Sequence, residues 1–301
     1  MMEFLFLDLD DTILDFHKAE RIALSKTLTE FGVEPAEEVL SLYHRINLWH
    51  WEQLEQGKLT REEVLVGRFA ALLRELAKIK EFRWIRVLYA YPERITDELL
   101  EVIAENDNIA KYLDIPMQHC DKDILRAMNR PGDRQELEAI IARVREKVPG
   151  ITLRTSLIAG FPGETQENFE HLCEFVKEAR FERLGCFAYS QEEGTPAGER
   201  EDQIDEQVRT DRAEMVMAEE MTIMEQMNEA KIGSSILCVV EGFDRYGECF
   251  FGRSEADAPD IDGKVFFTCK NKLAVGQFVT VKVEDVMDLD LIGVVTDEHP
   301  E

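Results

Sequence analysis

Two carboxylates near the amino terminus are spaced for chemistry on a phosphoryl group. The run FLFLDLDDTILDF sets Asp8, Asp10 and Thr12 at the carboxyl end of an apolar strand predicted at residues 2–8. Alternate residues of an extended chain share a face, so both carboxylates can converge on one cation. Such oxygens suit Mg²⁺, and one carboxylate could attack phosphorus while the other serves as acid and then base. The alternative is a strand end whose acids only cap the next helix.

This segment resembles the start of the haloacid-dehalogenase-like hydrolases, especially nucleotidase-type members with a helical cap after the first strand. The resemblance implies that Asp8 is the nucleophile, that Asp10 is the acid/base, and that residues 15–77 begin the cap. It stops there, because no later strand–Thr, Lys and acidic pair follow residue 77 in the order that the family requires.

A second set of polar residues lies in the middle of the chain. Gln118, His119, Arg154 and Tyr189 stand at or near predicted strand ends, the side where parallel α/β barrels gather ligands. The glycine-rich turn IAGFPGET at 158–165 lets backbone approach a ligand beside helix N–H groups. Each has a structural alternative: the turn can simply precede a capped helix, and His119 can be a hydrogen-bonded core residue.

The part of the chain that follows the two aspartates is predicted to be helical. Apolar residues at three- and four-residue steps predict helices through residues 16–77. Gly32 and Gly57 fall where helices would end, and Thr60 followed by Glu63 predicts a helix start.

The pattern of predicted secondary structure changes twice along the rest of the chain. From residue 84, four β–α units in succession imply a parallel sheet or part of a barrel. A polar helix is expected over about 203–231, and from 234 onward short strands broken by Gly and Asp predict a small antiparallel barrel.

Residues from about 72 to the end resemble the radical S-adenosylmethionine methylthiotransferase family. The resemblance is carried by YLDIPMQHCDKDILRAMNRPG, RTSLIAGFPGET and GCFAYSQEEGTPA, in that order. It implies an α/β fold with a partial parallel (β/α) barrel of the radical SAM type. A strand and helical cap segment would precede this barrel, and a small antiparallel, OB-like TRAM barrel would follow it. We therefore expect domains at 1–77, 78–233 and 234–301.

Sequence and charge favour a protein partner. QHC at 118–120 and GRSEADAPDIDG at 252–263 favour the branch that modifies an aspartate of small-subunit ribosomal protein twelve over the tRNA branch. The chain has 35 basic and 62 acidic residues, a net charge of −27, and residues 234–301 have 6 and 14, a net charge of −8. Such a surface repels tRNA phosphates and suits a basic ribosomal protein. No apolar run approaches the roughly 18 residues of a membrane span, so we expect a cytoplasmic protein without a membrane partner.

The family resemblance also implies S-adenosylmethionine and [4Fe–4S] clusters as cofactors. The S-adenosylmethionine side would consist of Gln118, His119, Arg154, Ser156, Gly160 and Tyr189. Ser156 departs from the family, because many members have Gly there. The family's catalytic cluster requires C-x3-C-x2-C, and the cysteines at 120, 173, 186, 238, 249 and 269 contain no such triplet. Thiolates hold such clusters, so we expect no iron–sulfur ligands and no radical chemistry.

The sequence therefore predicts a chimera that joins near LLRELAKI at 72–79. One interpretation is a methylthiotransferase-family protein that is inactive as it stands. A second is a Mg²⁺-dependent phosphohydrolase or nucleotidase that works through Asp8 and Asp10. A third is a non-catalytic acidic module that binds a basic ribosomal protein.

Overall fold

The computed structural model describes residues 16–30 and 35–299. Asp8, Asp10 and the strand predicted at 2–8 lie outside the described residues. The chain divides into two compact units, Met1–Phe82 and Arg83–Glu301. None of the described helices is long and apolar enough to cross a membrane.

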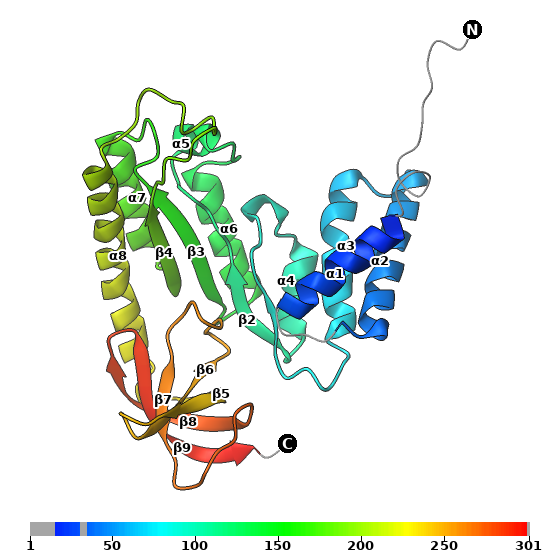
Figure 1. The fold of residues 1–301 in the computed structure, drawn as a ribbon, viewed down its shortest axis with the longest axis vertical. Helices are drawn as coiled ribbons and strands as arrows, with labels where there is room; N and C mark the ends of the chain where they lie inside the picture. The colour runs from blue at the N-terminus through cyan, green and yellow to red at the C-terminus, as the bar shows by residue number, and fades with distance from the viewer. Residues whose placement is uncertain (1–15, 31–34, 300–301) are drawn as a thin grey trace. The chain divides into compact units, whose positions relative to one another are not determined.

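The described part of the first unit is helical, as the apolar spacing predicted. It contains α1 (Phe16–Glu30), α2 (Glu37–Glu55) and α3 (Arg61–Leu76) (Figure 1). Gly57 follows α2 with φ of +67°, a backbone conformation that favours glycine. Thr60 caps α3 by accepting a hydrogen bond from the Glu63 amide, while the Glu63 carboxylate accepts one from the Thr60 amide. This reciprocal pair is the capping box that fixes a helix start.

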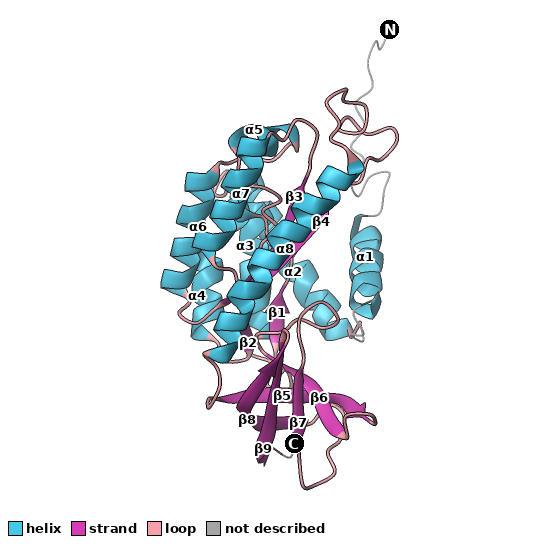
Figure 2. Cartoon of the chain, turned by 90° about the vertical axis from the view of Figure 1, so that its left-hand side faces the viewer, coloured by secondary structure: helices cyan, strands magenta, loops and turns pink. Residues whose placement is uncertain are grey.

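The second unit begins with a four-stranded parallel sheet in the order β1-β2-β3-β4. Its strands are β1 (Ile85–Val87), β2 (Ile109–Asp114), β3 (Thr152–Ala159) and β4 (Arg183–Ala188). The helices around it are η1 (Pro92–Arg94), α4 (Asp97–Glu105), α5 (Lys122–Ala127), α6 (Arg134–Lys147), α7 (Gln166–Ala179) and α8 (Glu206–Glu229). Because each strand is added beside the previous one, right-handed crossovers place α4, α6 and α7 along one face (Figures 1 and 2).

Strand β3 shows how the sheet separates its two faces. Leu153, Thr155 and Leu157 are fully buried, whereas the alternating Arg154 and Ser156 are only partly buried. Side chains of a strand alternate between faces. The polar pair therefore lies on the face opposite the helices.

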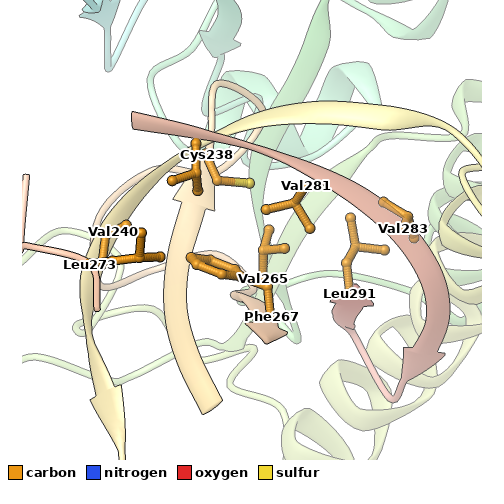
Figure 3. Packing of buried hydrophobic residues seen from close by; sticks show 9 residues of the cluster. Cys238, Val240, Val265, Phe267, Leu273, Val281, Val283 and Leu291 are labelled. Carbon is orange, nitrogen blue, oxygen red and sulfur yellow. The ribbon is translucent and has the colours of Figure 1, made fainter. Parts of the chain in front are cut away.

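The C-terminal strands form a closed barrel in the order β5-β6-β7-β9-β8. They are β5 (Ser235–Asp244), β6 (Cys249–Ser254), β7 (Val265–Thr268), β8 (Phe278–Met287) and β9 (Asp290–His299). Apolar side chains that include Val240, Phe267 and Val281 fill the barrel (Figure 3). The prediction of a small barrel is confirmed, with one difference: β7 and β9 pair in parallel. β9 pairs antiparallel with β8 and lies between β8 and β7, and it therefore runs in the same direction as β7.

The sheet and the barrel are joined through charged side chains. In the loop after β6, Asp257 accepts a 2.5 Å hydrogen bond from Arg183 of β4, and both side chains are almost fully buried. Farther along the same loop, Asp262 accepts a 2.7 Å hydrogen bond from the hydroxyl of Tyr112 and lies 3.6 Å from Arg154 Nε. The segment 252–263 that the sequence singled out therefore docks the barrel onto the sheet.

Candidate functional site

Most of the predicted S-adenosylmethionine residues meet at the carboxyl ends of β2, β3 and β4. Past the end of β2, the Gln118 amide donates to Ser156 O, and Gln118 O accepts from the Ile158 amide. His119 follows it, Gly160 directly follows β3, and Tyr189 directly follows β4. The turn, the histidine and the tyrosine therefore lie at one edge of the sheet, as predicted.

Arg154 is placed elsewhere. It is the third residue of β3, so it lies near the amino end of that strand rather than beside Gly160. Its guanidinium group donates to Asp114 over 3.0 Å and to Ser156 Oγ over 3.3 Å, and it also faces Asp262. The structure thus gives this side chain a place in the contact between sheet and barrel.

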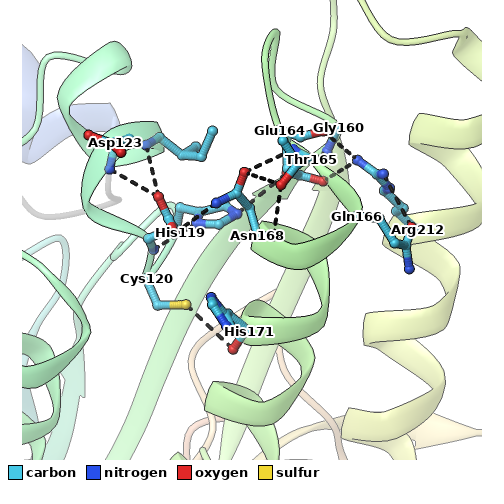
Figure 4. A network of polar contacts seen from close by, with 12 residues as sticks. His119, Cys120, Asp123, Gly160, Glu164, Thr165, Gln166, Asn168, His171 and Arg212 are labelled. Carbon is cyan, nitrogen blue, oxygen red and sulfur yellow. Dashed lines mark hydrogen bonds and ion pairs between the residues drawn. The ribbon is translucent and has the colours of Figure 1, made fainter.

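A buried carboxylate organises the glycine-rich turn. Glu164 has no exposed side-chain surface, and it accepts hydrogen bonds from the Gly160 amide over 2.9 Å and from Arg212 of α8 over 2.8 Å. His119 Nε2 lies 3.4 Å from the same carboxylate (Figure 4). Charge-assisted hydrogen bonds of this kind are the strong ones, so Glu164 ties the turn to α8.

The environment of His119 is that of a core residue. The ring is fully buried, and its Nδ1 accepts a 2.9 Å hydrogen bond from the Asp121 amide. Nε2 therefore carries the ring proton and faces Glu164. No face of this imidazole is open to solvent.

The start of α7 is closed by its own side chains. Thr165 and Asn168 form a capping box, and Asn168 Nδ2 donates to Asp121 over 2.8 Å. The Gly163 amide is also used, because it donates to Asp202 O over 3.1 Å. The amides of Gly160, Gly163, Thr165 and Asn168 are therefore all bonded within the protein.

Gly160 brings α8 against the turn. Its φ is +77°, and a Cβ added there would lie 2.3 Å from Arg209 Cγ, so a larger residue would collide with α8. Arg209 in turn donates to Tyr189 O over 2.8 Å. Tyr189 packs edge-on against Phe161, and its buried hydroxyl has no hydrogen-bond partner among the described residues.

Two groups at this edge remain for a ligand. The hydroxyl of Tyr189 is unbonded, and Gln118 is partly exposed, with no hydrogen bond from its side chain within the described part of the chain. An orphaned buried polar atom invites a ligand. A ligand at this edge would therefore meet the Tyr189 hydroxyl and the Gln118 side chain, whereas His119 Nε2 faces the Glu164 carboxylate and the Gly160 amide is already bonded to it.

The cysteines do not fit an iron–sulfur cluster. None of the six cysteines, all of which lie in the described part of the chain, forms a disulfide, and the described residues contain no group of three His, Cys, Asp or Glu side chains that could hold a metal ion. Burial raises the pKa of Cys120 and of Cys186 to about 12. Since clusters are held by thiolates, these side chains are poor ligands as well as scattered ones.

The sequence did not identify the central part of this network. Glu164 is the acidic residue in the sequence GET that ends the glycine-rich turn. Arg212 lies 48 residues away, in a helix expected to be polar. The one available signal was an acid directly before a helix cap, which by itself is compatible with a surface position.

Residues 27–176 match the radical SAM superfamily, and residues 232–296 match the TRAM domain. The ribosomal protein uS12 methylthiotransferase RimO of Clostridium novyi is 45% identical over 233 residues, which are 77% of this chain and 52% of that protein. RimO of Caldanaerobacter subterraneus is 47% identical over 222 residues, 74% of this chain and 50% of that protein. The chain thus spans about half the length of these curated relatives.

A solved structure of the Escherichia coli coproporphyrinogen III oxidase HemN, described as a radical SAM enzyme, shares 17% identity with this chain. The match covers 65% of this chain and 52% of that one, with a TM-score of 0.43.

Proposed function

The chain has the α/β fold of the radical SAM type followed by a TRAM barrel, and on this premise we propose that it is a methylthiotransferase-family protein that recognises ribosomal protein uS12. The observation that carries the proposal is the 45–47% identity to uS12 methylthiotransferases over about three quarters of the chain. The acidic barrel supports it, because a net charge of −8 over residues 234–301 complements a Lys/Arg-rich protein and opposes tRNA. Such a partner would place the protein in the cytoplasm.

Titration of the full chain with uS12 at increasing salt tests this proposal. We expect affinity to fall with ionic strength, because exposed charges would steer the complex. Charge reversal at Glu284 and Asp285, which are exposed on β8, should weaken binding about tenfold. Reversal at the exposed Glu170 and Glu174 of α7 changes the net charge equally and should have a smaller effect. Equal losses in both variants, or no binding, would contradict the proposal.

We further propose that this chain, on its own, binds uS12 without performing radical chemistry. The scattered positions of the six cysteines support this, and burial raises the pKa of the Cys120 and Cys186 thiols to about 12. Anaerobic reconstitution with iron and sulfide is expected to give no stoichiometric [4Fe–4S] spectrum. A full complement of cluster iron would refute this part and leave uS12 binding untouched.

A second proposal rests on the amino-terminal sequence. The D-x-D-x-T spacing at Asp8 and Asp10 supports a Mg²⁺-dependent phosphohydrolase, joined near residues 72–79 to the methylthiotransferase-like part. The division between Phe82 and Arg83 is compatible with such a join, although the radical SAM superfamily match begins earlier, at residue 27. Turnover of phosphate esters that requires Mg²⁺ and is lost in Asp8→Asn would support it, and no turnover by the unmodified chain would end it.

A further inference from the structure

A cavity of about 590 Å³ lies in the second unit between β4, α8 and two loops of the C-terminal barrel. Its size falls in the range of small-ligand pockets, roughly 300–1,000 Å³. Apolar side chains from β4 and α8, among them Phe187, Met217 and Met221, form much of its wall. Neither Gly160 nor Glu164 lines it, so it is distinct from the site at the carboxyl ends of the strands.

The cavity contains an unpaired acid. Glu220 of α8 lines it and is fully buried, and neither carboxylate oxygen has a hydrogen-bond partner within the described residues. Burial raises the pKa of Glu220 to about 8, with the Glu182 charge adding to the effect and Arg183 and Arg180 opposing it. A buried carboxyl group without a partner is costly. It therefore holds a proton, or it exchanges that proton for a cation.

The neighbouring cations are already engaged by other groups. Arg183 is bonded to Asp257 over 2.5 Å, and Arg154 is bonded to Asp114 over 3.0 Å. Arg180, which lies in the loop before β4, donates to Gln226 over 3.1 Å. None of these arginines forms an ion pair with Glu220, so its buried carboxylate has no cationic partner among them.

The barrel side of the cavity is also acidic. Asp262, Asp288 and Asp290 line it, and Asp288 is exposed at its edge. Carboxylates around an opening attract cations and repel anions. Arg154 and Arg183 also line the cavity, but they are paired with Asp114 and Asp257, so the remaining carboxylates of the lining favour a positively charged ligand.

We propose that this cavity binds an ammonium or guanidinium group carried on an aliphatic stem, with the charge at Glu220 and the stem against Met217, Met221 and Phe187. Long basic side chains bury their stems on apolar surface in this way, and methionine adapts to such partners. This inference does not depend on the proposed function. The same chemistry is supplied by a free polyamine or by a Lys or Arg side chain of a basic protein.

Calorimetric titration of the full chain with spermidine and with acetyl-Gly-Arg-Gly-amide tests the inference and separates the two sources. We expect at least one probe to bind, and Glu220→Gln to weaken its binding at least about tenfold. Glutamine matches the shape of the protonated acid, so the variant should fold. Glu219→Gln removes a neighbouring charge that is paired with Lys177 over 3.2 Å, and it should bind like the unmodified chain.

Proton release gives a second readout. At pH 7 the unmodified chain should release protons on binding, detected as heat that depends on the buffer, because Glu220 ionises when it meets the cation. The Glu220→Gln variant should release none. Binding of spermidine alone would assign the site to a polyamine, and tighter binding of the peptide would assign it to a protein side chain. Equal affinity in Glu220→Gln, binding without proton release, or no binding of either probe would overturn the inference.

Discussion

Replacing Glu164 by glutamine is expected to lower the free energy of unfolding of the second unit by about 3–5 kcal/mol. The substitution keeps the shape of the side chain and removes its charge. Arg212, whose side chain is only 11% exposed, would then keep a buried cation without a counter-charge. The Gly160 amide would also lose a charged acceptor at the turn. Urea denaturation at pH 7 measures the loss.

Glu178→Gln is the matched control for this prediction. Glu178 is bonded to Arg134 over 2.6 Å, but 65% of its side chain is exposed. Exposed pairs are worth about 0–1 kcal/mol because water solvates both partners. If the two variants lost similar stability, Glu164 would not be the centre of the turn that the contacts indicate.

The substitution Glu164→Gln should also disturb the candidate ligand site at the carboxyl ends of the strands. Tyr189 is positioned by Arg209, and Arg209 packs against Gly160. If the turn lost its contact with α8, the unbonded Tyr189 hydroxyl would therefore be held less firmly in position. Local interactions near residue 160 thus bear on binding at a residue almost thirty positions away.

The features that could be predicted from sequence are those set by local spacing. Thr60 and Glu63 are three residues apart, and their reciprocal caps follow from that spacing. Apolar periodicity likewise predicted the helices of the first unit, and the strand texture after residue 234 predicted a barrel. Each of these patterns reports on one turn of helix or one pleat of strand, which the chain specifies without tertiary contacts.

The buried ion pairs could not be predicted in this way. Glu164 and Arg212 are 48 residues apart, and Arg183 and Asp257 are 74 apart, so only the packed fold brings them together. Arg154 was expected at the mouth of the sheet because it was assigned to a position at or near a strand end. Because strand β3 is eight residues long and Arg154 is its third residue, this side chain lies near the amino end of the strand.

Replacing Asp257 by asparagine is expected to destabilise the contact between sheet and barrel by about 3–5 kcal/mol. Arg183 is 6% exposed and would lose the carboxylate that it meets over 2.5 Å. Denaturation monitored separately in the sheet and in the barrel measures the loss. We expect the two transitions to separate in the variant. Glu241→Gln, which removes a more exposed partner of Arg253, should keep them together.

The pH dependence of this loss identifies its cause. Burial opposes ionisation of Asp257, but Arg183 and the hydrogen bonds from Ser254 outweigh it and lower the pKa of Asp257 below its ordinary value of 3.8. A carboxyl group with a lowered pKa stabilises the folded state above its unfolded pKa and loses that contribution as the pH falls through the folded pKa. The difference between the unmodified chain and Asp257→Asn should therefore be full at pH 7 and shrink below about pH 4.

A double substitution distinguishes an unpaired charge from lost packing. Replacing both partners, Arg183→Met with Asp257→Leu, removes the pair without leaving a buried ion, and such replacements are often neutral. We expect the double variant to recover most of the stability that Asp257→Asn loses. If it were as unstable as the single variant, the geometry of the Ser254 and Asp257 loop would be what holds the barrel on the sheet, since Asp257 also accepts from Ser254 Oγ over 2.6 Å.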